Sequence, residues 1–304
     1  MKAFFSLLAG HLAVLAVNII FGFNSPTAKL IVPEWISPTL FTLARISFAT
    51  LLFWVVGLFM PHEKVSWKDK GIICIGGVFG LVGVMYSFAE ALCYTSPVDI
   101  TLIAALAPVF VMLLAALFLK EPITLRKAAG VFIGMAGVLT LILPKILAEG
   151  IGNMSLKGDL LCFVNIISYA IYLISTRKVT QKYSTITLMK WMFLSSWLFT
   201  LPLCIGESIT SVPMWCHGMQ WIPFLRLSFI AVAATGLAYF LIPVGLKRLR
   251  PTTVSMYNNL QPLIASCIAI YWGQDQFGWN KVFAALLVFT GVWLVTRSRK
   301  KEKE

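Results

Sequence analysis

Polar side chains recur at helical spacing inside long apolar stretches of this chain. Tyr257 and Gln261 are four residues apart, with Asn258 between them, and Tyr86 and Glu90 are also four apart. Residues separated by three or four positions share one side of a helix. Each set would therefore present hydroxyl, amide or carboxyl groups on one face, where they can bind a small zwitterion while the aromatic rings cover its apolar part.

A third polar set has spacings of four and three residues and consists of Asn165, Tyr169 and Tyr172. Two interpretations stay open for all three sets: the side chains line a binding cavity, or they hydrogen-bond across packed helices, as amides and hydroxyls do within membranes. The candidate substrate-binding residues are Tyr86, Glu90, Asn165, Tyr169, Tyr257, Asn258 and Gln261.

Arg45 and Glu90 are ionisable residues within apolar stretches, where a charge costs about 2.5 to 3.5 kcal/mol on insertion scales. One interpretation is a fixed anchor, in which Arg45 pairs with Glu90 or with a backbone carbonyl. The other is functional: Arg45 binds a substrate carboxylate, or Glu90 carries a proton, with Asp99 as the second acidic candidate.

The composition indicates the environment of these residues. Hydrophobic residues make up 59% of the 304 positions and charged residues 12%, whereas a soluble domain carries about 25% charge. Apolar stretches of about 20 residues match the length of a helix that crosses about 30 Å of hydrocarbon. We therefore predict an all-α membrane protein, surrounded by the lipid bilayer, with ten transmembrane helices. The predicted spans are 4–23, 36–59, 70–93, 97–119, 126–144, 157–176, 186–205, 222–246, 251–272 and 279–297.

Lysine and arginine set the expected orientation, because the short loops that carry them stay on the cytoplasmic side. With both termini inside, nineteen of the 25 basic residues fall on the inner side. We therefore expect both termini in the cytoplasm and a multi-pass protein of the plasma membrane, or of the inner membrane in a bacterium. The net charge of +13 then reflects topology and does not indicate a nucleic-acid partner.

The chain also repeats itself. "TSPVDITLIAALAP" and "RPTTVSMYNNLQP" hold two prolines at the same separation, and Pro262 lies 154 residues after Pro108. The same shift pairs Glu121 with Asp275 and Lys127 with Lys281. Each half then has five spans, so the second half enters the membrane from the opposite side, as in the inverted repeats of secondary transporters.

We expect a first five-helix repeat at 1–150 and a second, inverted repeat with a basic C-terminal tail at 151–304. Pro108 and Pro262 are predicted to lie inside helices, where each removes a backbone hydrogen bond and kinks the helix. Together with Arg45 they are the candidate structural or gating residues.

Several segments together resemble one known family. They are "FGFN", "LARISF", "ALCYTSPVDITLIAALAPVF", "LKEPITLRKAAGVFIGMAGVLTL" and "LRPTTVSMYNNLQPLIASCIAIYWGQDQ". With these segments and its two sets of five spans, the chain is similar, over essentially its whole length, to the EamA type of the drug/metabolite transporter superfamily. The resemblance implies ten helices around a central cavity and export or exchange of small metabolites, often amino acids. It also implies that spans one, three, four, six, eight and nine line the cavity, with five and ten peripheral.

Other chemistries have little support in the sequence. The six cysteines show no C-x-x-C spacing, and no Walker, G-x-S-x-G or H-E-x-x-H motif occurs, so we expect no metal, no cofactor and no enzymatic activity. We expect a secondary transporter that works by alternating access on a small-molecule substrate, driven by the solute gradient or by protons. The alternatives are a membrane-embedded enzyme or sensor, and a carrier of sugar or nucleobase-like solutes.

Overall fold

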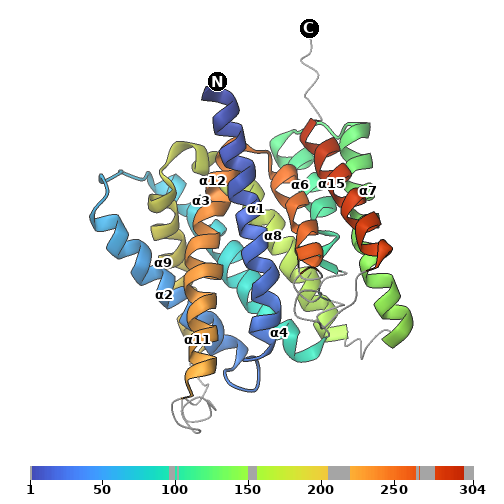
Figure 1. Cartoon of the computed structure of the whole chain (residues 1–304). Helices are drawn as coiled ribbons and strands as arrows, with labels where there is room; N and C mark the ends of the chain where they lie inside the picture. Colours follow the sequence, from blue (N-terminus) through green and yellow to red (C-terminus); the bar gives the residue numbers. More distant parts are fainter. Residues whose placement is uncertain are drawn as a thin grey trace.

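The structure is a computed structural model that describes residues 2–95, 100, 103–149, 156–204, 220–264, 267 and 278–297. All regular elements of these residues are helical, and they form one bundle of roughly parallel and antiparallel helices (Figure 1). In the first half the elements are α1 (Lys2–Lys29), α2 (Pro38–Leu58), α3 (Trp67–Gly77), η1 (Val78–Gly83), α4 (Val84–Tyr94), α6 (Ala107–Leu119) and α7 (Leu125–Glu149).

The second half repeats this order. Its elements are α8 (Leu156–Lys182), α9 (Thr185–Leu203), α11 (Trp221–Phe229), η3 (Ile230–Leu237), α12 (Ala238–Arg248), α13 (Pro251–Met256), η4 (Tyr257–Leu260) and α15 (Trp279–Arg297). Helical segments overlap each of the ten predicted ranges, but α1 and α8 each continue six residues beyond their predicted ends at 23 and 176. Asp99, Pro97 and Asp275, on which parts of the sequence analysis depend, lie outside the described residues.

Short polar signals in the sequence begin several of these helices. Ser37, Ser66 and Ser184 each accept a backbone hydrogen bond from the first turn of α2, α3 and α9, which satisfies one of the free N–H groups at a helix start. Pro38 and Pro251 occupy the first turn of α2 and α13, where proline costs no hydrogen bond. These residues explain why the helices start where they do.

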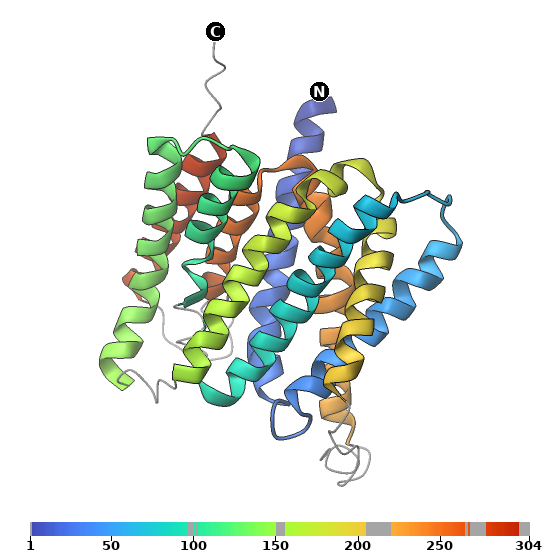
Figure 2. The ribbon, with the colours of Figure 1, turned by 180° about the vertical axis from the view of Figure 1, so that it is seen from behind.

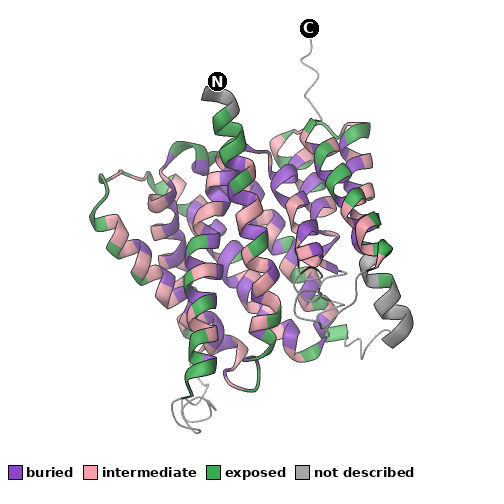
Figure 3. Ribbon diagram, in the orientation of Figure 1, coloured by how far each residue is buried: buried purple, intermediate pink, exposed green. Residues whose placement is uncertain are grey.

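Seven continuous helical stretches in the described part are long and apolar enough to cross a membrane. Large apolar side chains such as Leu117, Phe132 and Leu286 are exposed on the outside of the bundle. Buried residues follow the inward faces of the helices and exposed residues lie outward and at helix ends (Figure 3). An apolar outer surface of this kind suits lipid, because backbone groups are satisfied within each helix.

The two halves pair with each other in a reciprocal way. The first helix of each half packs on the third helical stretch of the other, α1 on α12 and α8 on α4. The fifth helices, α7 and α15, lie side by side (Figures 1 and 2). A Cβ added at Gly291 of α15 would lie 2.6 Å from the carbonyl oxygen of Gly130, so glycine permits this close contact.

Helix boundaries also recur at the shift of 154 found in the sequence. α4 and α12 begin and end 154 residues apart, and α3 and α11 begin 154 apart. A π-helical segment precedes α4 in one half and α12 in the other, η1 and η3. Wider π turns of this kind are uncommon and frequently occur at functional sites.

Both prolines predicted to kink a helix lie instead at a helix start. Pro108 is in the first turn of α6, directly after a turn at Ala105 and Leu106. Pro262 is the second residue of a helical turn that follows the 3₁₀ segment η4. The prediction was wrong in this detail because the regular α-helix is already interrupted before each proline. The proline therefore removes no hydrogen bond from an intact α-helix.

Candidate substrate-binding site

The 3₁₀ segment η4 is joined to α1 by two side-chain contacts. The Tyr257 hydroxyl lies 2.7 Å from Nδ1 of His11. Gln261, one residue after η4, donates from Nε2 to Oδ1 of Asn18 at 2.9 Å, and Asn18 donates to the carbonyl of Val14. Tyr257 and Gln261 therefore share a face, as their spacing predicted, and this face is turned toward α1.

Asn258 extends in the other direction, toward α8. Its side chain is a hydrogen-bonding partner of the Tyr169 hydroxyl. The 3₁₀ segment η4 interrupts the helix that begins with α13. It thus contacts α1 on one side and α8 on the other, through side chains that the sequence identified as candidates.

Three tyrosines form a cluster in the interior of the bundle: Tyr169 and Tyr172 of α8 and Tyr239 of α12, called the tyrosine cluster below. The rings of Tyr169 and Tyr172 have centroids 6.4 Å apart, and Tyr239 lies within electrostatic range of both. The Tyr172 hydroxyl is buried and has no hydrogen-bond partner among the described residues. A Cβ at Gly80 would lie 2.5 Å from Cγ of Tyr172, so the glycine of η1 makes room for this ring.

Arg45 reaches this cluster from α2. It is 2% exposed, its Nε donates to Oγ1 of Thr235 in η3 at 2.8 Å, and it interacts electrostatically with Tyr239. Nη1 of Arg45 is buried with no hydrogen-bond partner among the described residues. A buried cation with a free donor is costly, and it is suited to a carboxylate.

The predicted pairing of Arg45 with Glu90 is wrong. Glu90 forms an ion pair with Lys157 of α8 at 3.5 Å, with 18% of the Glu90 side chain exposed. The Lys157 ammonium also lies over the ring of Tyr94, the last residue of α4. Glu90 lies one turn before that helix end, beside Lys157 at the start of α8. Arg45 donates its hydrogen bond to Thr235 instead.

The two remaining candidates lie along α4 and α8. Asn165 donates from Nδ2 to the backbone carbonyl of Val84 at 2.7 Å, directly after the π-helical segment η1. Tyr86 is half-buried in α4. A polar side chain of the opposite half thus bonds at or beside each π-helical segment, Arg45 to a residue within η3 and Asn165 to the residue directly after η1.

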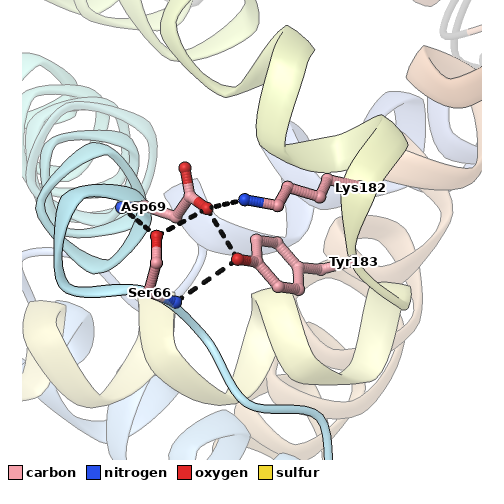
Figure 4. Close-up of polar contacts among 4 residues, drawn as sticks. All are labelled: Ser66, Asp69, Lys182 and Tyr183. Atoms are coloured by element: carbon pink, nitrogen blue, oxygen red, sulfur yellow. Dashed lines mark hydrogen bonds and ion pairs between the residues drawn. The ribbon is translucent and has the colours of Figure 1, made fainter.

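A separate polar network ties α3 to the end of α8 (Figure 4). Asp69 forms an ion pair with Lys182 and accepts hydrogen bonds from the Tyr183 hydroxyl at 2.6 Å and the Ser66 hydroxyl at 2.8 Å. The backbone N–H of Ser66 donates to the Tyr183 oxygen at 3.3 Å. This network joins the two halves at the end of the bundle where α1 begins.

The loop before α3 is held to the same turn by Glu63, which accepts the backbone N–H of Ser184 at 3.0 and 3.2 Å. Burial opposes ionisation of Glu63, but hydrogen bonds from Ser184 and Thr187 and the nearby charge of Lys247 outweigh it and lower its pKa. Glu63 is therefore a carboxylate at neutral pH.

Tyr239 and Thr235 are site residues that the sequence analysis missed. They are four residues apart in "TGLAY", the same helical spacing that identified the other polar sets. Among the described residues no group of three or more His, Cys, Asp and Glu side chains gathers that could hold a metal.

The EamA-like transporter family matches residues 8–143 and again residues 156–297. The chain belongs to this family. The two matches cover both halves of the bundle, so the chain has the two-repeat organisation of an EamA-like transporter. With its apolar helices it is a multi-pass protein of the plasma membrane or inner membrane.

Its relatives come from distant organisms, and two of the three described here are named as transporters. The uncharacterized transporter YyaM of Bacillus subtilis is 25% identical over 93% of this chain and 92% of its own length. An uncharacterized transporter of Archaeoglobus fulgidus is 26% identical over 94% and 98%, and the WAT1-related protein At1g43650 of Arabidopsis thaliana is 22% identical over 97% and 92%. A solved crystal structure superposes with a TM-score of 0.74 over 96% of both chains at 19% identity, which indicates the same fold.

Proposed function

We propose that this chain is a secondary transporter that exports or exchanges small zwitterionic metabolites, amino acids or compounds like them, by alternating access. The observation that carries the proposal is the interruption at η4. Its polar side chains Tyr257 and Asn258 contact α1 on one side and α8 on the other. Interrupted helices at the contact between repeats are where secondary transporters bind their substrates.

The groups around η4 match the two ends of a zwitterion. The unpartnered Nη1 of Arg45 would bind a carboxylate, the hydroxyl and amide oxygens of Tyr169 and Asn258 would accept from an ammonium group, and the rings of the tyrosine cluster would cover the apolar part. In this proposal the contacts of Tyr257 with His11 and of Gln261 with Asn18 are made in the present conformation and exchanged as the substrate enters.

The topology we propose is ten spans in two inverted repeats, with both termini in the cytoplasm. The start of α1 and the end of α15 lie at the same end of the bundle (Figure 1). The connection from α2 to α3, which contains Lys64, and the first turn of α3, which contains Lys68 and Lys70, reach this end as well. The positive-inside rule favours this end as the cytoplasmic one. The reciprocal pairing of α1 with α12 and α8 with α4 supports the inverted relation, which would let the bundle open to either side.

Efflux from proteoliposomes loaded with a pooled metabolite mixture, read by mass spectrometry with and without a pH gradient, tests the proposal. We expect selective loss of zwitterionic compounds, weakened by Arg45→Gln and Gln261→Leu. Thr290→Val serves as the matched control, because Thr290 is exposed on α15 and bonds only to its own helix. Correctly folded and inserted protein that releases no solute would overturn the transporter proposal, and selective release of sugars or nucleobases would overturn the substrate class.

A further inference from the structure

A pocket of about 240 Å³ lies at the end of the bundle where α1 begins, away from η4 and the tyrosine cluster. It is formed by the end of α2, the loop to α3, the first turns of α3 and the start of α9. Its polar lining includes His62, Glu63, Lys64, Lys70 and Lys190. The volume is below the about 300–1,000 Å³ of sites for drug-sized ligands, so the pocket suits a small group and not a whole metabolite.

The acidic side chains of this region, Glu63 and Asp69, are already bonded to other residues of the chain. Glu63 accepts the Ser184 backbone N–H and is attracted by Lys247. Asp69, next to Lys70, is held by Lys182, Tyr183 and Ser66 (Figure 4). The three pocket lysines therefore form no ion pair with any described carboxylate, and the pocket carries an excess of positive charge.

Tryptophan rings hold two of these lysines in place. The Lys70 ammonium lies 4.3 Å from the ring centroid of Trp67 and 4.4 Å from that of Trp191. The Lys190 ammonium lies 4.2 Å from the centroid of Trp54. Cation–π contacts fix an ammonium group without using up its charge or all of its three donors, so both cations remain available to an anion.

Exposed apolar side chains adjoin the pocket residues along the chain. Leu58 and Phe59, directly before the pocket loop, are 77% and 83% exposed, and Trp67 is 85% exposed. Tryptophan at a helix end marks the membrane interface. An anion that reaches the pocket would therefore lie beside a surface that suits hydrocarbon chains.

We propose that this pocket binds the phosphate headgroup of an anionic phospholipid, with its acyl chains lying along Leu58, Phe59 and Trp67. On the proposed topology this end of the bundle faces the cytoplasm, where positive pockets between helices suit anionic headgroups. The exposed apolar side chains beside the pocket favour a lipid over a soluble phosphate. The bound headgroup would bridge α2, α3 and α9, since Lys70 belongs to α3 and Lys190 to α9. The proposal requires no transport activity and is tested separately from it.

Native mass spectrometry of the full chain in detergent measures this binding. Phosphatidylglycerol, phosphatidylcholine of the same acyl chains, and glycerol 3-phosphate are the three probes. We expect retention of phosphatidylglycerol over phosphatidylcholine on the order of thirtyfold, since each of the three pocket lysines should raise the preference for an anionic lipid about threefold. The double variant Lys70→Gln/Lys190→Gln should lower this preference about tenfold.

The matched control is Lys68→Gln/Lys178→Gln, which loses the same net charge from two exposed lysines outside the pocket and should keep the preference. Lys64→Gln, an exposed pocket lysine, serves if the double variant does not fold, and it should lower the preference about threefold. Equal loss in the control variant would overturn the pocket as the site. Glycerol 3-phosphate that binds with the same lysine dependence and displaces the lipid would overturn the lipid as its occupant.

Discussion

The Tyr257 hydroxyl lies 2.7 Å from Nδ1 of His11, which joins the interrupted segment η4 to the first helix of the opposite half. Both side chains are half-buried. A hydrogen bond between two helices in a membrane contributes on average only about 0.6 kcal/mol to stability. The contact is therefore weak enough to be broken and remade during a transport cycle.

Removing either partner of this contact should have the same effect on transport. We expect Tyr257→Phe and His11→Ala each to lower transport several-fold, and the double variant to lower it no further, because both single changes break one shared bond. A double-mutant cycle on initial transport rates, with the thermal midpoint of each variant, measures this. Losses that add fully in the double variant would show that the two residues act independently.

Much of the fold was predictable because hydrophobic length and loop charge are local properties of the sequence. Ser37 with Pro38, and Ser184, indicate helix starts by their type alone. The π-helical segments were not predictable, since their wider turns depend on what packs against them, such as Tyr172 against Gly80.

The site was predictable in part for the same reason. The shared face of Tyr257 and Gln261 follows from their spacing, and both lie against α1. The partner of Arg45 did not follow from spacing, because residues at similar helical depth need not face each other. The hydrogen-bond partner of Arg45 is Thr235, which is 190 residues away in sequence, and not Glu90.

The ion pair of Lys127 with Glu121 should stabilise the start of α7. Its atoms are 2.8 Å apart and the Lys127 side chain is 2% exposed. Lys127→Met leaves the Glu121 carboxylate without its main partner, so we expect a loss of about 2 kcal/mol in the free energy of unfolding. Arg177 still attracts Glu121, which keeps the loss below that of an isolated buried charge.

Denaturant unfolding in mixed micelles measures this change. The double variant Lys127→Met/Glu121→Gln should recover most of the stability, because no uncompensated charge remains. The exposed neighbour Arg126→Gln is the control. A double variant as unstable as the single one would mean that Lys127 acts through packing.

Glu90 and Lys157 form a pair whose lysine is exposed, so water screens their attraction and the pair should contribute little to stability. We expect Glu90→Gln to fold normally and to keep whatever pH dependence transport shows, because the carboxylate already has a cation beside it. Lys157→Gln should behave in the same way. Transport by both variants between pH 5 and 8 gives the answer, and a pH dependence lost only in Glu90→Gln would identify Glu90 as the proton carrier.

Glu63 should make stability depend on acid pH. Its pKa is lowered from 4.5 because hydrogen bonds from Ser184 and Thr187 outweigh the effect of burial. A carboxyl whose pKa is lower in the folded state stabilises the protein above its unfolded pKa, and this stabilisation is lost as pH falls through the folded pKa. We therefore expect Glu63→Gln to lower the thermal midpoint at pH 7 and to make little difference at pH 3. Glu34→Gln, at an exposed position in the loop before α2, is the control, and a Glu63→Gln deficit that persists unchanged at pH 3 would contradict the assignment.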